Sequence, residues 1–181
     1  WTDRGTPVTY LLGNHDPWHR TYFSEELGVS LVSESLGVTH AGVRLHLAHG
    51  DAVASTHGLY AWLRPLMRHP APMRVYQSLL PADLGLGLAR WVSQVLHDES
   101  PDPAVIEALR LHAREVLRDR EADITIMGHS HKAALHAWPE GVYVNTGNWY
   151  DHRTFARLDE EGIRLSRWNG TRALDIEAAE I

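Results

Sequence analysis

Three short motifs combine histidine or asparagine with glycine and could bind a metal ion. They are Gly13-Asn14-His15-Asp16, His49-Gly50-Asp51 and Gly128-His129-Ser130-His131. Imidazole nitrogens and amide oxygens, without sulfur, suit Mn²⁺, Fe or Zn²⁺ better than a soft metal. The glycines let the backbone turn sharply and leave room for a ligand. We therefore interpret the three motifs as parts of one metal site.

The spacing within the motifs indicates which side chains share a target. His129 and His131 are two residues apart, and in an extended loop such residues point the same way. We expect their imidazoles to face one ion or two neighbouring ions, with His49 and Asn14 reaching the same place. His15 should point elsewhere, where it could donate to a phosphate oxygen or protonate a leaving group. Taken alone, any one of these histidines could instead be a solvated loop residue.

Each motif directly follows a segment with the pattern of a β-strand. Strands are predicted over 7–12, 29–33, 36–40, 43–48, 123–127, 141–145, 154–158 and 163–168, with a hairpin turn at 159–162. Polar residues on loops at strand ends are where sites usually lie. His46, three residues before His49, alternates away from the side that faces the site, whereas Asp16 and Asp51 are expected to brace their loops.

Residues 53–120 have no strand pattern and read as a helical insertion punctuated by prolines. Its last helix is expected to begin at Asp102, as N-cap, and Pro103 in the first turn. Residues 52–82 contain arginines but no carboxylate. The functional interpretation is that Arg64, Arg68, Arg74 and Trp62 bind an anionic headgroup and a lipid tail, or rest on an anionic membrane surface. The alternative is an ordinary helical subdomain with a solvated basic face.

Composition excludes several classes of protein. The chain has 181 residues, a net charge of −6, 44% hydrophobic and 22% charged residues, which fits one globular domain. Without cysteine there is no disulfide scaffold, thiolate zinc site or cysteine nucleophile. The mild acidity argues against a nucleic-acid binder. No apolar run is long enough to span a membrane, and we expect a cytoplasmic protein, with a possible peripheral contact to the inner membrane through the insertion.

The three motifs resemble those of the calcineurin-like metallophosphoesterase superfamily, in which G-N-H-D/E, a later strand-end His and G-H-x-H bind a two-metal centre. The resemblance implies that Asn14, His49 and His129 bind one metal and that His131 binds the other. It implies that His15 is the catalytic histidine near the scissile phosphate. Two divalent ions, Mn²⁺ first and Fe or Zn²⁺ as alternatives, would lower the pKa of bound water and neutralise charge on the transferring group.

The same resemblance implies a fold and a substrate class. The fold is a four-layer α/β/β/α sandwich, expected here as one domain over residues 1–181 with the helical insertion at 53–120. Within the superfamily the chain is similar to bacterial UDP-2,3-diacylglucosamine diphosphatases of lipid A synthesis, through H-G-D at 49–51, the insertion after it and the stretch Asn145–Trp149. The substrate would then be a small phosphoester or pyrophosphate, and the similarity to these diphosphatases implies a nucleotide-linked lipid. The best-known diphosphatases carry Arg where this chain has His15, which points to another phosphoester.

Two other functions stay open at this stage. One is a phosphodiesterase or phosphoprotein phosphatase that acts on a soluble substrate. The other is a non-catalytic module that binds one metal through Asn14, His49 and His129.

The superfamily pattern begins with D-x-H and G-D ahead of G-N-H-D, and this chain lacks both. Its only Gly-Asp pair is Gly50-Asp51. By the resemblance, the absent residues supply most ligands of the first metal and the carboxylate that bridges both ions. Because residue 1 is Trp and a strand pattern follows at once, we expect an N-terminally incomplete domain that lacks its first strands, with a degenerate pseudo-enzyme as the alternative. The chain alone is expected to be inactive, or nearly so, as a two-metal hydrolase.

Overall fold

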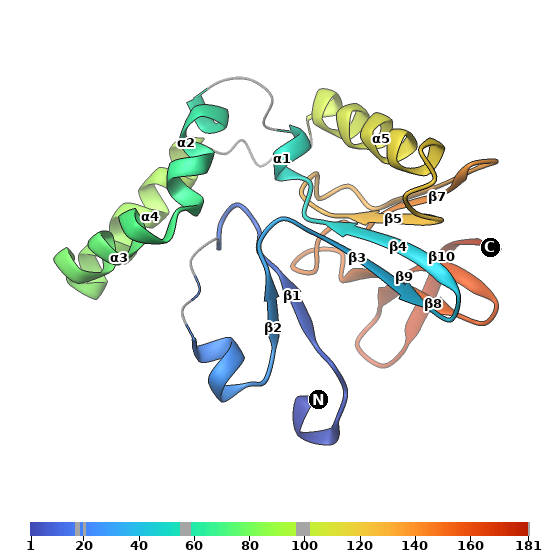
Figure 1. Cartoon of the computed structure of the whole chain (residues 1–181), viewed down its shortest axis with the longest axis horizontal. Coiled ribbons are helices and arrows are strands. Elements are labelled where there is room, and N and C mark those ends of the chain that lie inside the picture. Colours follow the sequence, from blue (N-terminus) through green and yellow to red (C-terminus); the bar gives the residue numbers. More distant parts are fainter. Residues whose placement is uncertain (17–18, 20, 55–58, 97–101, 181) are drawn as a thin grey trace. The chain divides into compact units, whose positions relative to one another are not determined.

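A computed structural model describes residues 1–16, 19, 21–54, 59–96 and 102–180, and the side chains of 59–61, 82 and 92–96 lie outside this description. The chain divides into two compact units (Figure 1). The first contains residues 1–33 and 55–100, and the second contains residues 34–54 and 101–181. The single domain over residues 1–181 stays a prediction.

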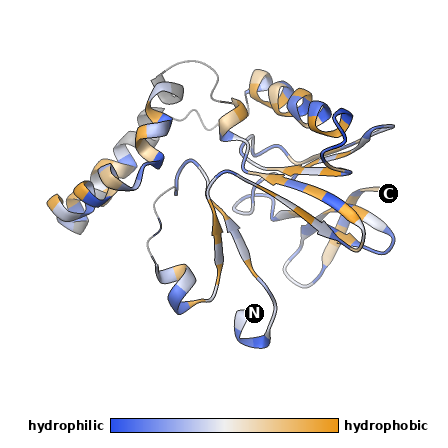
Figure 2. Cartoon of the chain, viewed as in Figure 1, coloured by the Kyte–Doolittle hydropathy of each residue, from blue (hydrophilic) through white to orange (hydrophobic). Residues whose placement is uncertain are grey.

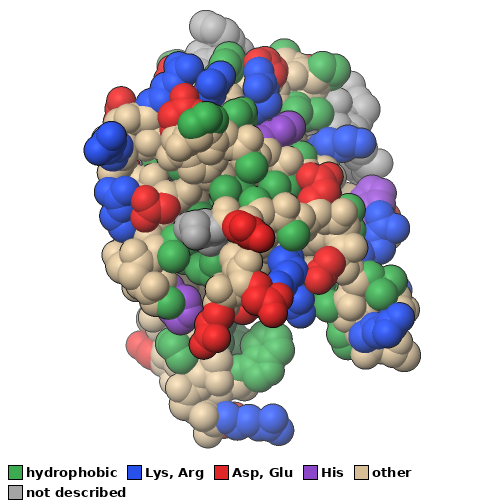
Figure 3. Space-filling model, turned by 90° about the vertical axis from the view of Figure 1, so that its right-hand side faces the viewer, with side chains coloured by type: hydrophobic (Ala, Val, Ile, Leu, Met, Phe, Trp, Pro, Cys, Tyr) green, Lys and Arg blue, Asp and Glu red, His purple; other side chains and the backbone are tan. Residues whose placement is uncertain are grey.

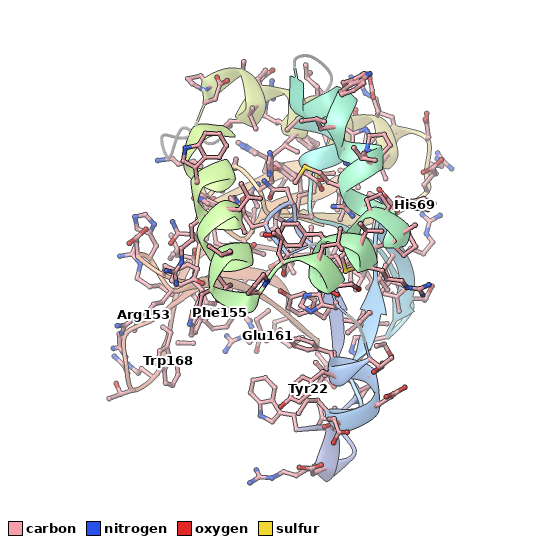
Figure 4. The ribbon with its side chains drawn as sticks, turned by 90° about the vertical axis from the view of Figure 1, so that its left-hand side faces the viewer. Tyr22, His69, Arg153, Phe155, Glu161 and Trp168 are labelled. Atoms are coloured by element: carbon pink, nitrogen blue, oxygen red, sulfur yellow. The ribbon has the colours of Figure 1, made fainter. Side chains whose placement is uncertain are left out.

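The first unit combines a small parallel sheet with helices. Its elements are η1 (Thr2–Arg4), β1 (Thr9–Leu11), η2 (Tyr22–Glu26), β2 (Ser30–Val32), α2 (Leu59–Arg68), α3 (Pro70–Leu79) and α4 (Ala82–Leu96). Strands β1 and β2 pair in parallel. His69 is the N-cap of α3, where its Nδ1 accepts a hydrogen bond of 3.2 Å from the Ala71 amide (Figure 4). Pro70 then occupies the first turn, where its missing N–H removes no helical bond.

The second unit contains two sheets and two helices. Its elements are β3 (Ser35–His40), β4 (Val43–Ala48), α1 (Asp51–Ala54), α5 (Pro103–Arg118), β5 (Ile124–Met127), β6 (Ala134–Trp138), β7 (Gly141–Asn145), β8 (Thr154–Asp159), β9 (Gly162–Trp168) and β10 (Ala173–Ala179). One sheet has the order β3-β4-β5-β7-β6, with β4, β5 and β7 parallel and the two outer strands antiparallel. The other is the antiparallel meander β10-β9-β8.

The five-stranded sheet is covered on both faces (Figure 1). On one face, Leu109 and Ala113 of α5 pack on Met127 and Tyr143. On the other, β9 closes the core, and the buried residues there are Ile124, Val142, Val144, Ile163 and Leu165. These contacts give three layers, α/β/β, and confirm the predicted α/β class.

Helix α5 has the start that the sequence predicts. The Asp102 carboxylate accepts from the Ala104 amide at 2.8 Å, and Pro103 occupies the first turn. Hydrophobic residues recur along the helix among hydrophilic ones (Figure 2), and the apolar side, with Leu109, Ala113 and Leu117, is buried. Although α5 lies inside the expected 53–120 insertion, it packs on the sheet of the second unit. The expected insertion also contains α2, α3 and α4, which belong to the first unit.

Candidate metal site

Two of the three motifs meet at one edge of the five-stranded sheet. His49 directly follows β4, and Gly128 directly follows β5. Because β4, β5 and β7 are parallel, their carboxyl ends share one edge, where α/β sheets commonly place their sites. The Gly128 amide donates to the His49 carbonyl oxygen at 3.1 Å, which extends the β4–β5 pairing into the two motifs.

The His49 and His129 imidazoles lie side by side. Their ring centroids are 5.3 Å apart and the ring planes are inclined by 73°. Two imidazoles that bind one ion through nitrogen at about 2.1 Å, in tetrahedral arrangement, would place their centroids about 5 Å apart. A Cβ built on Gly128 would lie 3.9 Å from His49 Nδ1, an ordinary van der Waals distance, so residue 128 lies directly beside the His49 ring. The pair therefore has the spacing that a shared metal ion requires.

The loop that carries His129 and His131 is not extended. His129 has φ 65° and His131 has φ 57°, so both adopt the left-handed conformation, which is uncommon outside glycine. The rule that residues i and i+2 point the same way holds for an extended loop and therefore does not apply to His129 and His131. His129 is half-buried beside His49, whereas the His131 side chain is exposed. The second-metal role of His131 stays a prediction.

Asn145 fixes this loop, and its role was not foreseen from the sequence. It is the last residue of β7 and only 2% of its surface is exposed. Its Nδ2 donates to the Gly128 carbonyl at 2.7 Å and to the Tyr143 hydroxyl at 3.1 Å, while its Oδ1 accepts from the Gly147 amide at 3.1 Å. Burial raises the pKa of the Tyr143 phenol, against a smaller opposite effect of the Asn145 hydrogen bond. A polar residue that ends an apolar strand, as in G-V-Y-V-N, is the sequence signal.

The loop after Asn145 is fixed by hydrogen bonds of its own. Asn148 Oδ1 accepts from the amides of Asp151 and His152, at 2.9 and 3.3 Å. The main-chain carbonyl oxygen of Arg153 accepts a hydrogen bond of 2.9 Å from the Trp168 amide of β9, and both residues are labelled in Figure 4. The stretch that carried part of the family resemblance thus belongs to the same edge of the sheet as His49 and His129.

Asn14 and His15 belong to the first unit, in the loop after β1. The Asn14 side chain is buried and that of His15 is exposed. Asp16 braces this loop as expected: its Oδ1 accepts from the Gly13 amide at 2.7 Å, and its Oδ2 accepts from the Tyr10 hydroxyl. The metal and catalytic roles of Asn14 and His15 stay predictions.

The four residues expected to bind substrate lie on α2 and α3. Trp62 is 75% exposed, Arg64 is half-buried and Arg74 is exposed. Arg68 has a structural connection, because its guanidinium donates to the main-chain oxygens of Ser33, Leu12 and Gly13, the last two at 3.4 and 3.5 Å. It therefore ties α2 to the ends of β1 and β2, and its contact with a substrate stays a prediction.

The two imidazoles are the part of the proposed metal centre that the second unit displays. Among the described residues, no three side chains of His, Cys, Asp or Glu lie close enough together to hold an ion. An ion held by His49 and His129, with an amide oxygen or water as a further ligand, stays a prediction. A two-ion centre would also need carboxylates of the kind that the superfamily pattern places ahead of G-N-H-D.

His46 points away from this site, toward α5. Its ring centroid lies 6.4 Å from that of His112 on α5, and its Nδ1 is buried with no hydrogen-bond partner in the described part of the chain. Burial lowers the pKa of His46, and the nearby His112 lowers it further.

The second unit also has a hollow of about 1140 Å³ at the opposite end of β4. Its charged lining consists of Asp159, Glu160, Glu161, Glu180 and Arg164. Acidic and basic side chains mingle on the corresponding face (Figure 3). Val43, the first residue of β4, lines this hollow, whereas His49 follows the last. The hollow is therefore separate from the imidazole pair.

No family model matches the chain, but curated sequences do. UDP-2,3-diacylglucosamine hydrolase of Vibrio parahaemolyticus is 21% identical over 91% of this chain and 70% of its own length. The hydrolase of the same name from Xanthomonas oryzae is 25% identical over 92% of this chain and 72% of its own length. Among solved structures, Vps29 of Chaetomium thermophilum aligns over 99% of this chain and 86% of its own, with 12% identity and a TM-score of 0.46.

Within the described residues, no helix has both the length and the apolar character to cross a bilayer.

Proposed function

Since the chain is a sequence relative of the UDP-2,3-diacylglucosamine hydrolases, as its motifs predict, we propose that it carries part of the metal centre of a phosphoester or pyrophosphate hydrolase. The observation that carries this proposal is the His49–His129 pair, 5.3 Å between ring centroids, at the carboxyl edge of a parallel sheet. The substrate class we propose is a nucleotide-linked lipid, in keeping with the relatives' name. A divalent ion at the pair would stabilise negative charge that develops on the phosphoryl group.

The chain's own residues have distinct proposed tasks. His49 and His129 hold the ion, and Asn14 is proposed to complete its ligands. His131, exposed and in the same loop, would serve a second ion. His15, exposed in the loop after β1, would donate a proton to the phosphoryl or leaving-group oxygen. Arg64 and Arg74 would contact the anionic headgroup, and the exposed Trp62 would contact the acyl chains, so that the helices of the first unit select lipid over soluble esters.

The test separates metal binding from turnover. We expect the chain to bind about one Mn²⁺ or Zn²⁺ tightly, and we expect His129→Gln to abolish this binding. His40→Gln is the matched control, since His40 is an exposed histidine of β3, and it should bind metal like the wild type. Binding that survives His129→Gln would refute the assignment of the imidazole pair.

Turnover then decides between the enzyme and the non-catalytic module. The absence of a three-ligand cluster of His, Cys, Asp or Glu among the described residues favours weak or no turnover by this chain. Robust Mn²⁺-dependent hydrolysis of a phosphodiester by the 181-residue chain would contradict that expectation. If the reading frame extends upstream of Trp1, the longer product is assayed beside it. One tightly bound ion and no turnover in either product would support the single-metal module.

A further inference from the structure

We propose that Asn145 is a positioning residue: its carboxamide fixes the peptide that precedes His129 and so holds the His129 imidazole beside His49. The positioning of His129 by Asn145 is argued from the structure alone. Only its use, the presentation of two imidazoles to one ion, rests on the proposed function.

The Gly128–His129 peptide is held from both neighbouring strands. Its carbonyl oxygen, on Gly128, accepts from Asn145 Nδ2 at 2.7 Å and from the Ser130 amide at 2.8 Å. The Gly128 amide donates to the His49 carbonyl at 3.1 Å. Residue 128 is therefore tied to the end of β4 by its amide and to the end of β7 by its carbonyl. The contact with β7 runs through a side chain, so it depends on the residue type at position 145.

The loop needs such a support because its conformation is unfavourable. Both His129 and His131 have φ near 60°. Left-handed conformations of non-glycine residues persist only when the surrounding structure fixes them, and they cluster at functional sites. The Asn145 hydrogen bond orients the peptide on the N-terminal side of His129, which is one of the two peptides that set its φ and the direction of its side chain.

Packing alone does not explain an asparagine at this position. Asn145 pairs with Met127, and Met127 pairs with Ala48, so the three residues share the face of the sheet toward α5. The other two are apolar, and an apolar residue would fill the space without the penalty of burying an amide. The Asn145 amide is buried because both of its ends have partners: Gly128 and Tyr143 for the nitrogen, Gly147 for the oxygen.

The test compares two substitutions within this network. Asn145→Leu keeps the branched shape and the number of side-chain heavy atoms and removes the hydrogen bond to Gly128. Tyr143→Phe is the matched control, because it removes a buried hydroxyl that bonds Asn145 but leaves the contact with Gly128. Both full-length variants are checked for folding by circular dichroism. Two quantities are then measured: nuclear Overhauser contacts between the His49 and His129 rings in the metal-free chain, and Zn²⁺ affinity by competition with a chromophoric chelator.

We expect Asn145→Leu to lose the ring contact and to weaken Zn²⁺ binding about 10- to 100-fold, the usual effect of removing a residue that orients a ligand. Tyr143→Phe should retain the contact and the affinity to within about twofold. If Asn145→Leu does not fold, Asn145→Asp replaces it, measured at a pH at which the side chain is a carboxylate, since it then has the same shape and no donor. Retained ring contact in the asparagine variant, or equal losses in both variants, would overturn the inference. If the wild type binds no Zn²⁺ but only the asparagine variant loses the ring contact, the positioning role stands and the proposed metal function fails.

Discussion

Substituting Gly50 by Ala tests how tightly the H-G-D motif is packed against α5. Gly50 has φ +107°, and a Cβ there would lie 2.9 Å from Leu109 Cδ2 and 3.3 Å from His129 Cβ. Leu109 is fully buried, so its methyl cannot move into solvent. Gly170 is the matched control, because it has φ +105° and nothing within 4 Å of its Cβ position. Gly170→Ala therefore measures backbone strain without a clash.

The contacts at each position predict different losses in the free energy of unfolding for the three substitutions. Gly170→Ala should cost about 1 to 2 kcal/mol through strain alone. Gly50→Ala should cost about 1 to 3 kcal/mol more, because it also overpacks the contact with Leu109. Leu109→Ala should cost about 2 to 5 kcal/mol through the cavity it leaves. In the double variant the Cδ2 methyl is gone, so the total should fall short of the sum by about 1 to 2 kcal/mol.

The assay must report on the second unit alone, because a chain of two units need not unfold in one step. Native-state hydrogen exchange at the amides of Ile124 and Val144, in the core of the sheet, gives that free energy directly. Additivity of Gly50→Ala and Leu109→Ala to within about 0.5 kcal/mol would refute the clash. Equal losses for Gly50→Ala and Gly170→Ala would refute it as well.

Four further substitutions test other parts of the structure. Burial and the neighbouring His112 lower the pKa of His46, so the unfolded chain binds a proton that the folded chain does not. The free energy of unfolding of the second unit, from the same exchange measurement, should therefore fall as the pH drops below about 6.5, and His46→Leu should flatten this fall; an unchanged slope would argue against it. Asp102→Ala removes the N-cap of α5 and should lower the same free energy by about 1 kcal/mol, with no change if the cap is irrelevant. Trp62→Glu and Leu66→Glu change exposed positions of α2. In a catalytically active form of the protein they should raise KM for a lipid substrate severalfold and leave KM for small chromogenic esters unchanged. Equal effects on both substrates would reject lipid selection.

The strands that the sequence predicts are those whose own residues favour the extended state. The runs at 43–48, 123–127 and 141–145 became β4, β5 and β7 because β-branched and large apolar residues fill both faces of a covered sheet. The sequence pattern does not predict β6 and β10, with sequences Ala-Leu-His-Ala-Trp and Ala-Leu-Asp-Ile-Glu-Ala-Ala. Both are edge strands rich in alanine, and they are extended because β7 and β9 offer them a ladder. Such pairing is not visible in local propensity.

The site divides in the same way. That His49 and His129 meet follows from the sequence, because two parallel strands end beside them. The left-handed backbone at His129 and His131 does not follow, because it depends on a hydrogen bond between Gly128 and Asn145, 17 positions apart in the chain. The hydrogen bonds of Arg68 to main-chain oxygens do not follow from the sequence either, because the local pattern of residues 52–82 predicts only a substrate contact for this arginine.

The path of the chain through its two units has a consequence for how the second unit could be built. Its two segments, 34–54 and 101–181, are joined covalently only through residues 55–100 of the first unit. They are joined non-covalently by the parallel β4–β5 ladder and by the packing of α1 on α5. A single proteolytic nick within 55–100 would therefore leave two fragments that still hold each other, with His49 on one and His129 on the other. The imidazole pair could then be assembled by complementation, and, with the ion at the place we propose, mixing the two fragments would restore metal binding.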